Sequence, residues 1–128
     1  MKKKHKAVIS TINFGTFHGY AMACIGTNVE EVLSKHKDKG WREYLTRVKE
    51  EGFDCDFVHE AKMANGNVYS CVFVSKKGGD EWYIKVAHEC FHLCQILAQN
   101  YHIDMILEKE SMAYQHSHLM RQILELAK

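Results

Sequence analysis

The sequence predicts an α+β protein, in which a small antiparallel sheet packs on helices within a single domain spanning residues 1–128. Two patterns predict this class. Short runs rich in β-branched and aromatic residues indicate strands, and longer runs with apolar residues every three or four positions indicate helices. The chain also contains no Pro, no internal repeat and no low-complexity linker, which favours one compact unit.

Two hairpins account for the predicted sheet. Residues 7–12 and 20–25 are β-rich and are separated by a glycine-containing turn. The second pair comprises 53–61, where apolar and polar residues alternate, and 68–75. The Asn-Gly dipeptide at 65–66 between them is the strongest hairpin-turn signal in the chain. Each pair is therefore expected to be antiparallel.

Four segments carry helical periodicity: 29–37, 41–50, 80–100 and 108–126. Thr27 or Asn28 can cap the first helix, and Asp80 can cap the third, because their side-chain oxygens accept hydrogen bonds from free backbone N–H groups. Gly40 is expected to interrupt the chain between the first two helices.

Composition excludes several classes of protein. The formal net charge is only +1, so no overall field draws the chain to nucleic acid. The basic start at 1–6 is expected to be a flexible tail rather than a binding arm, and the polar residues after it exclude a signal peptide. No run of eighteen apolar residues exists to span a membrane. Five cysteines without a C-x-x-C pair suggest free, buried thiols and a cytoplasmic location.

The third predicted helix carries an H-E-x-x-H motif, formed by His88, Glu89 and His92. Residues four apart share one face of a helix, so the two imidazoles can point at one Zn²⁺. Glu89 can then accept a proton from water. An apolar stripe lies roughly opposite the histidines and comprises Tyr83, Val86, Ala87, Cys90, Cys94, Leu97 and Tyr101. The competing interpretation is two solvated surface histidines.

A catalytic zinc site needs a third protein ligand and leaves one position open. Glu110 is the predicted third ligand, eighteen residues after His92, and Glu108 is the alternative at nearly the same distance. The polar segment at 100–104 can turn the chain back, so that two antiparallel helices would face each other across the metal.

This pattern resembles the gluzincin branch of the zincin metallopeptidases. The resemblance covers about the last fifty residues and implies that His88, His92 and Glu110 bind zinc while Glu89 is the general base. The run from Glu110 to Tyr114 also resembles small, mostly phage-borne zincin-like proteins. That likeness implies a zincin-like fold with the motif helix followed by a C-terminal helix, and a location in the host cytoplasm.

The predicted activity is hydrolysis of a peptide or protein substrate. Zn²⁺ held by two imidazoles and a carboxylate would lower the pKa of its bound water toward neutrality. Glu89 would accept the proton as that water attacks a carbonyl group and would pass it on to the leaving amine. Tyr114 is the favoured donor to the oxyanion because it lies one turn from Glu110. His102, His118 and Arg121 are other candidate donors. The strand at 68–75 is expected to form the edge that pairs with an extended peptide.

Two other functions compete with this one. A non-catalytic protein could keep the metal-holding scaffold and bind a host protein. An intact Glu89 argues against that function, because a structural metal site has no use for a base. Nucleic-acid binding is disfavoured, since the basic residues are not interleaved with aromatic ones. No membrane partner is expected.

Overall fold

The computed structural model describes residues 7–15, 17, 19–62, 68–76 and 78–128, and it has the predicted α+β class. The predicted basic tail at 1–6 and the Asn-Gly turn at 65–66 lie outside the described residues. The strands are β1 Val8–Asn13, β2 Tyr20–Ile25, β3 Phe57–Lys62 and β4 Val68–Val74. The helices are α1 Val29–Lys35, α2 Lys39–Glu50, α3 Glu81–Asn100 and α4 Lys109–Leu126.

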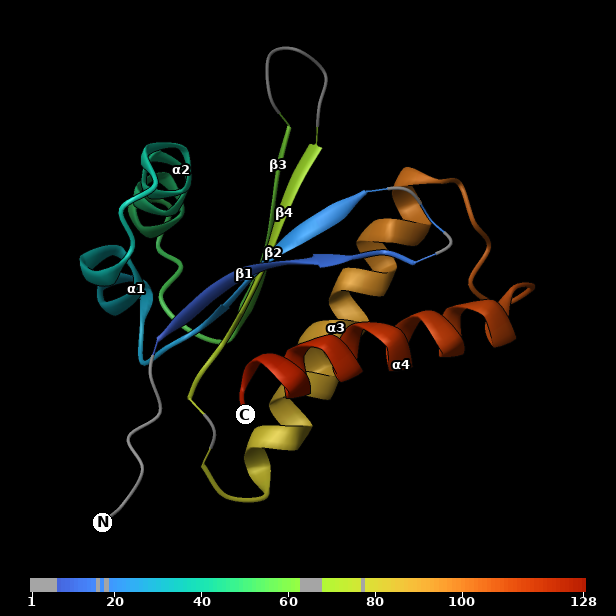
Figure 1. Ribbon diagram of the computed structural model, residues 1–128. Helices are drawn as coiled ribbons and strands as arrows, with labels where there is room; N and C mark the ends of the chain where they lie inside the picture. The colour runs from blue at the N-terminus through green and yellow to red at the C-terminus, as the bar shows by residue number, and fades with distance from the viewer. Residues whose placement is uncertain (1–6, 16, 18, 63–67, 77) are drawn as a thin grey trace.

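The four strands form one sheet in the order β1-β2-β4-β3. Both predicted hairpins are confirmed, since β1 pairs with β2 and β3 pairs with β4 in antiparallel fashion. The expectation of a purely antiparallel sheet is wrong, because β2 and β4 run parallel. After β2 the chain passes through α1 and α2 and returns as the second hairpin, whose last strand inserts beside β2 (Figure 1).

The expected edge strand is also wrong. The segment at 68–75 forms β4, which lies inside the sheet, and β3 takes the edge. Burial explains this exchange. Four consecutive apolar residues, Cys71 to Val74, are at most 1 % exposed, as suits a strand covered on both faces. In β3, Glu60 is exposed to water, which an edge strand tolerates.

Helices cover both faces of the sheet, with α1 and α2 on one side and α3 and α4 on the other (Figure 1). Side chains of β4 alternate between the two faces of the sheet, so this strand contributes to the hydrophobic core on each face. Cys71 and Phe73 pack toward α1 and α2, whereas Val72 and Val74 pack toward α3 and α4. None of the helices described is long and apolar enough to cross a membrane.

Helix starts follow the predicted capping in part. The side chain of Asn28 accepts from the backbone N–H of Glu31 at 2.9 Å, so α1 begins with a capped turn. Asp38 caps α2 in the same way, and Gly40 therefore lies in the first turn of α2 instead of interrupting the chain. Asp80 occupies the cap position of α3, but its side chain makes no capping hydrogen bond.

The apolar stripe of α3 is confirmed at its centre and wrong at its ends. Val86, Cys90, Cys94 and Leu97 are buried, but Tyr83 and Tyr101 are more than 40 % exposed. Four buried positions were not expected: Trp82, Glu89, Leu93 and Ala98. All five cysteines are free thiols, and only Cys55 is not fully buried.

Candidate metal centre

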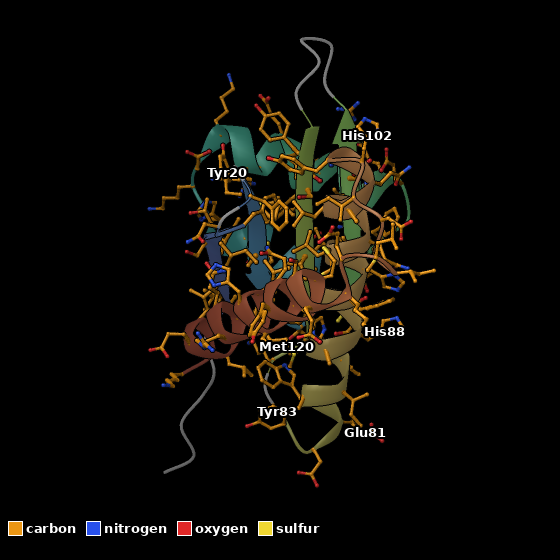
Figure 2. The ribbon with its side chains drawn as sticks, turned by 90° about the vertical axis from the view of Figure 1, so that its right-hand side faces the viewer. Tyr20, Glu81, Tyr83, His88, His102 and Met120 are labelled. Carbon is orange, nitrogen blue, oxygen red and sulfur yellow. The ribbon has the colours of Figure 1, made fainter. Side chains whose placement is uncertain are left out.

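The polar face of α3 brings three metal-ligating side chains together. His88 and His92 are exposed and one helical turn apart, and their Nε2 atoms lie 3.0 Å from each other. A carboxylate oxygen of Glu89 joins them, and the three ligand atoms lie within 4.8 Å of one another. His88 projects outward from α3 in Figure 2. This is the only such group among the residues that the structure describes.

A neighbouring amide fixes how His92 presents its ring. Nδ1 of His92 lies 3.1 Å from Oε1 of Gln95, one turn further along α3. Because that oxygen only accepts, Nδ1 is the donor in this hydrogen bond, and Nε2 faces His88. Ligating histidines commonly donate their other ring N–H to a carbonyl or carboxylate oxygen. The pair is therefore arranged to share a cation between its Nε2 atoms.

Glu89 is a buried carboxyl group beside these exposed imidazoles, and only 4 % of the residue is accessible. Burial raises its pKa above the ordinary value of 4.5, because the charged form loses its hydration. His88 and His92 oppose this rise, and the nearby carboxylate of Asp56 adds to it. A positive charge held between the imidazoles would favour the ionised form of Glu89 further.

The three side chains open into a groove of about 520 Å³ between α3 and the start of β3. Its walls are formed by residues 56–58 on one side and by α3 residues from His88 to Gln99 on the other. Asp56 has a positive φ of 51°. Its carboxylate accepts from the backbone N–H of Ser75 at 2.9 Å and pairs with Lys85 at 3.4 Å. These contacts hold the wall that faces α3.

The residues predicted on α4 do not join the group. Glu110 and Tyr114 are exposed, as is Glu108, and none of them lines the groove. The helix packs on another side of α3, where Nε2 of His116 donates to the carbonyl oxygen of Ala87 at 2.9 Å. The ligand role of Glu110 and the donor role of Tyr114 therefore stay predictions.

The other candidate donors lie outside the groove as well. His118 is hydrogen-bonded to the side chain of Asn13 at 2.8 Å, which ties α4 to the end of β1. His102 and Arg121 are exposed. In this arrangement none of the three side chains lines the groove or is placed to donate to an oxyanion there.

Two groove residues were missed from the sequence. Gln95 could have been found, because it lies three residues after His92 on the same polar face. Asp56 could not, because it is 32 residues before His88 and reaches the groove only through the pairing of β3 with β4.

The arrangement suits a divalent cation with nitrogen ligands, as Zn²⁺ prefers, and it places a carboxylate where it could take a proton. Comparison with known proteins gives no relative: no family model, no curated protein and no solved structure matches this chain. The chemistry of the site is therefore inferred from its own side chains.

Proposed function

We propose that this protein is a zinc-dependent, metallopeptidase-like hydrolase, in which His88 and His92 bind the metal and Glu89 is the general base. One observation carries the proposal: the two Nε2 atoms lie 3.0 Å apart, and the buried carboxyl group of Glu89 lies within 4.8 Å of both. Glu110, the third ligand predicted from the sequence, lies outside this group and is not needed for the proposal.

Zinc bound there would supply a Lewis acid that polarises a carbonyl group and acidifies water. Glu89 would accept a proton from the attacking water and then donate it to the leaving amine. Burial supports this role, since it raises the pKa of Glu89 from that of an ordinary surface carboxylate toward the operating range of a base. Gln95 would hold His92 in the correct tautomer.

The edge strand β3 supports a peptide as the substrate. It borders the groove through Phe57 and Val58, and it pairs with β4 on its other side. Among the described strands none pairs with the other edge of β3, where an extended peptide could add as a further strand, with alternate carbonyl groups pointing toward β3. Backbone hydrogen bonds would then provide affinity with little dependence on sequence.

A non-catalytic metal protein that binds a host protein is the second candidate. The observation that favours it is the position of Glu89, whose carboxylate is close enough to both imidazoles to serve as a ligand. A carboxylate bound to the metal would no longer be available as a base. The two functions therefore differ in what Glu89 does.

Glu89→Gln separates the two candidates. For the hydrolase we expect about one zinc per chain in both forms. Cleavage of denatured casein should fall by roughly a hundredfold or more, because the amide cannot accept the proton. Elemental analysis of protein purified without added metal and a fluorescent casein assay measure the two effects. Glu81→Gln, at an exposed position on the same helix, is the matched control.

Other outcomes would decide against the hydrolase. If Glu89→Gln retains zinc and still cleaves at the wild-type rate, Glu89 is not the base. If the variant loses the metal and the wild-type protein cleaves nothing, Glu89 is a ligand and the binding protein is the better description.

A further inference from the structure

A second pocket, of about 320 Å³, lies at the opposite face of the sheet from the metal centre. Four aromatic rings and two carboxylates line it: Tyr20, Trp41, Tyr44, Tyr69, Asp38 and Glu43. The rings come from β2, β4 and α2. In Figure 2, Tyr20 and His88 lie on opposite sides of the molecule, so the two sites are separate.

The positions of the rings follow from the fold. Met22 and Cys71 are partners in the parallel pairing of β2 with β4, and Tyr20 and Tyr69 each lie two residues earlier. Side chains two residues apart in a strand share a face, so both tyrosines lie on the side covered by α1 and α2. Trp41 and Tyr44 are three residues apart on α2 and complete the pocket.

A hydrogen-bonded chain fixes one wall. The hydroxyl group of Tyr44 donates to Nδ1 of His59 at 2.7 Å, and Nε2 of the buried His59 donates to the carboxylate of Glu51. This series of hydrogen bonds orients the ring of Tyr44. It also shifts electron density toward the phenol, because successive hydrogen bonds that end on a carboxylate polarise one another.

The rings keep part of their surface open: Tyr20 is exposed, and Trp41, Tyr44 and Tyr69 are partly buried, with Trp41 and Tyr44 also packed against the core beneath α2. Among the residues that the structure describes, no two of the four rings stack on each other. Tyr20 is 52 % exposed although it is a large aromatic residue at the sheet surface. Open ring faces carry a negative electrostatic potential, which attracts cations.

The charges around the pocket also select for a cation. Among the residues that the structure describes, Asp38 and Glu43 are the charged residues in the lining, and no basic side chain joins them. Three of the four basic residues of α2 line a neighbouring groove, which shares Glu43 with the pocket; they are Lys39, Arg42 and Arg47. An anion would therefore be repelled by the pocket, and a neutral ligand would gain hydrogen bonds to the carboxylates but no charge attraction.

We propose that this pocket binds an organic cation that carries an alkylated ammonium group. Methyl groups on the nitrogen contact ring faces and leave no N–H donor to satisfy, whereas a primary ammonium would have to exchange three hydrogen bonds to water for those that the two carboxylates offer. A volume of about 320 Å³ is at the lower end of the range for small-molecule pockets and has room for such a headgroup. This site does not depend on the metal centre.

Choline and 3,3-dimethylbutan-1-ol form a matched pair of probes, because they have the same shape and only choline is charged. We expect choline to shift the indole N–H resonance of Trp41 in a saturable way. The alcohol should bind about tenfold more weakly, since it lacks the cation–π attraction. Equal binding of the two probes, or no saturable shift with choline, would overturn the proposal. Tighter binding of methylguanidinium than of choline would overturn the choice of an alkylated ammonium.

Variants compared by titration calorimetry, which does not need the Trp41 signal, locate the site. Trp41→Leu and Asp38→Asn should each weaken choline binding by about threefold or more. Asparagine also caps helices well, so Asp38→Asn removes the charge and keeps the start of α2. Tyr114→Leu alters an exposed aromatic residue on α4 and should leave binding unchanged. The same affinity in His88→Ala would show independence from the metal centre, whereas unchanged binding in Trp41→Leu would contradict the assignment.

Discussion

The two C-terminal helices, α3 with 20 residues and α4 with 18, differ sharply in what they contribute to the candidate metal centre. Helix α3 supplies His88, Glu89 and His92, which converge on one point. Helix α4 carries the exposed side chains of Glu110 and Tyr114, which remain apart from the groove. Both helices bury an apolar side against the same face of the sheet.

The difference shows which parts of a site are local. Residues on one helix keep the spacing that the helix imposes, whatever the rest of the chain does. A ligand on the next helix depends on how the two helices pack, and here His116 and Ala87 hold α4 against another side of α3. The groove is instead completed by residues 56–58, far away in the sequence.

The largest expected effect is the loss of metal from α3 variants. His88→Ala and His92→Ala should each weaken zinc retention by more than about a hundredfold, because each removes a ligand of the proposed site. Zinc content after dialysis measures this loss. His102→Asn, which changes an exposed histidine at a positive φ of 55°, should keep its zinc. If all three variants keep the same amount of zinc, His88 and His92 do not bind the metal.

Stability should depend on the buried sides of these helices and not on their exposed aromatic residues. Leu93→Ala removes a fully buried side chain of α3 and should lower the free energy of unfolding by about 2–5 kcal/mol. Tyr114→Ala, at a residue that is 75 % exposed, should change it by about 0.5 kcal/mol or less. Urea denaturation of the two variants tests this contrast. A large loss in Tyr114→Ala would show that its ring packs on a surface in solution.

The groove wall that faces α3 should protect the thiol of Cys55 from alkylation. Burial, together with the hydrogen bond and charge of Asp56, raises the pKa of Cys55 from 9.0 to about 12. The stabilisation of the folded protein that comes from this raised pKa is therefore full below pH 9 and is lost as the pH rises through 12. At pH 8 we expect iodoacetamide to alkylate folded Cys55 at least about tenfold more slowly than the unfolded chain.

Mass spectrometry follows the alkylation of each thiol. Asp56→Asn should accelerate the reaction of Cys55, because it removes the charge that opposes the thiolate. An unchanged rate in this variant would show that Asp56 does not control the thiol.

The smallest expected effect belongs to α4. Glu110→Gln should change zinc affinity by about twofold or less, as a typical surface substitution does, because Glu110 is exposed and outside the group. Competition with a chromophoric chelator measures the affinity. A loss comparable to that of His88→Ala would establish the predicted third ligand and would require α4 to move when metal binds.

Much of the fold was predictable because its signals are local. The strand runs, the capped start of α1 and the long amphipathic α3 depend on neighbours within a few residues. The parallel contact of β2 with β4 was not predictable, because it joins segments about fifty residues apart. Tyr83 was expected in the core and is exposed, since periodicity places a residue on a face but does not say where that face is covered.

The sequence by itself determined the convergence of His88, Glu89 and His92, because a helix of any protein sets residues one turn apart at the same distance. Only the tertiary structure decided what surrounds them. Packing of the sheet placed β3 at its edge and Asp56 across the groove, and it gathered the rings of the second pocket from three elements. Such contacts depend on how whole faces fit together, which no short stretch of the chain specifies.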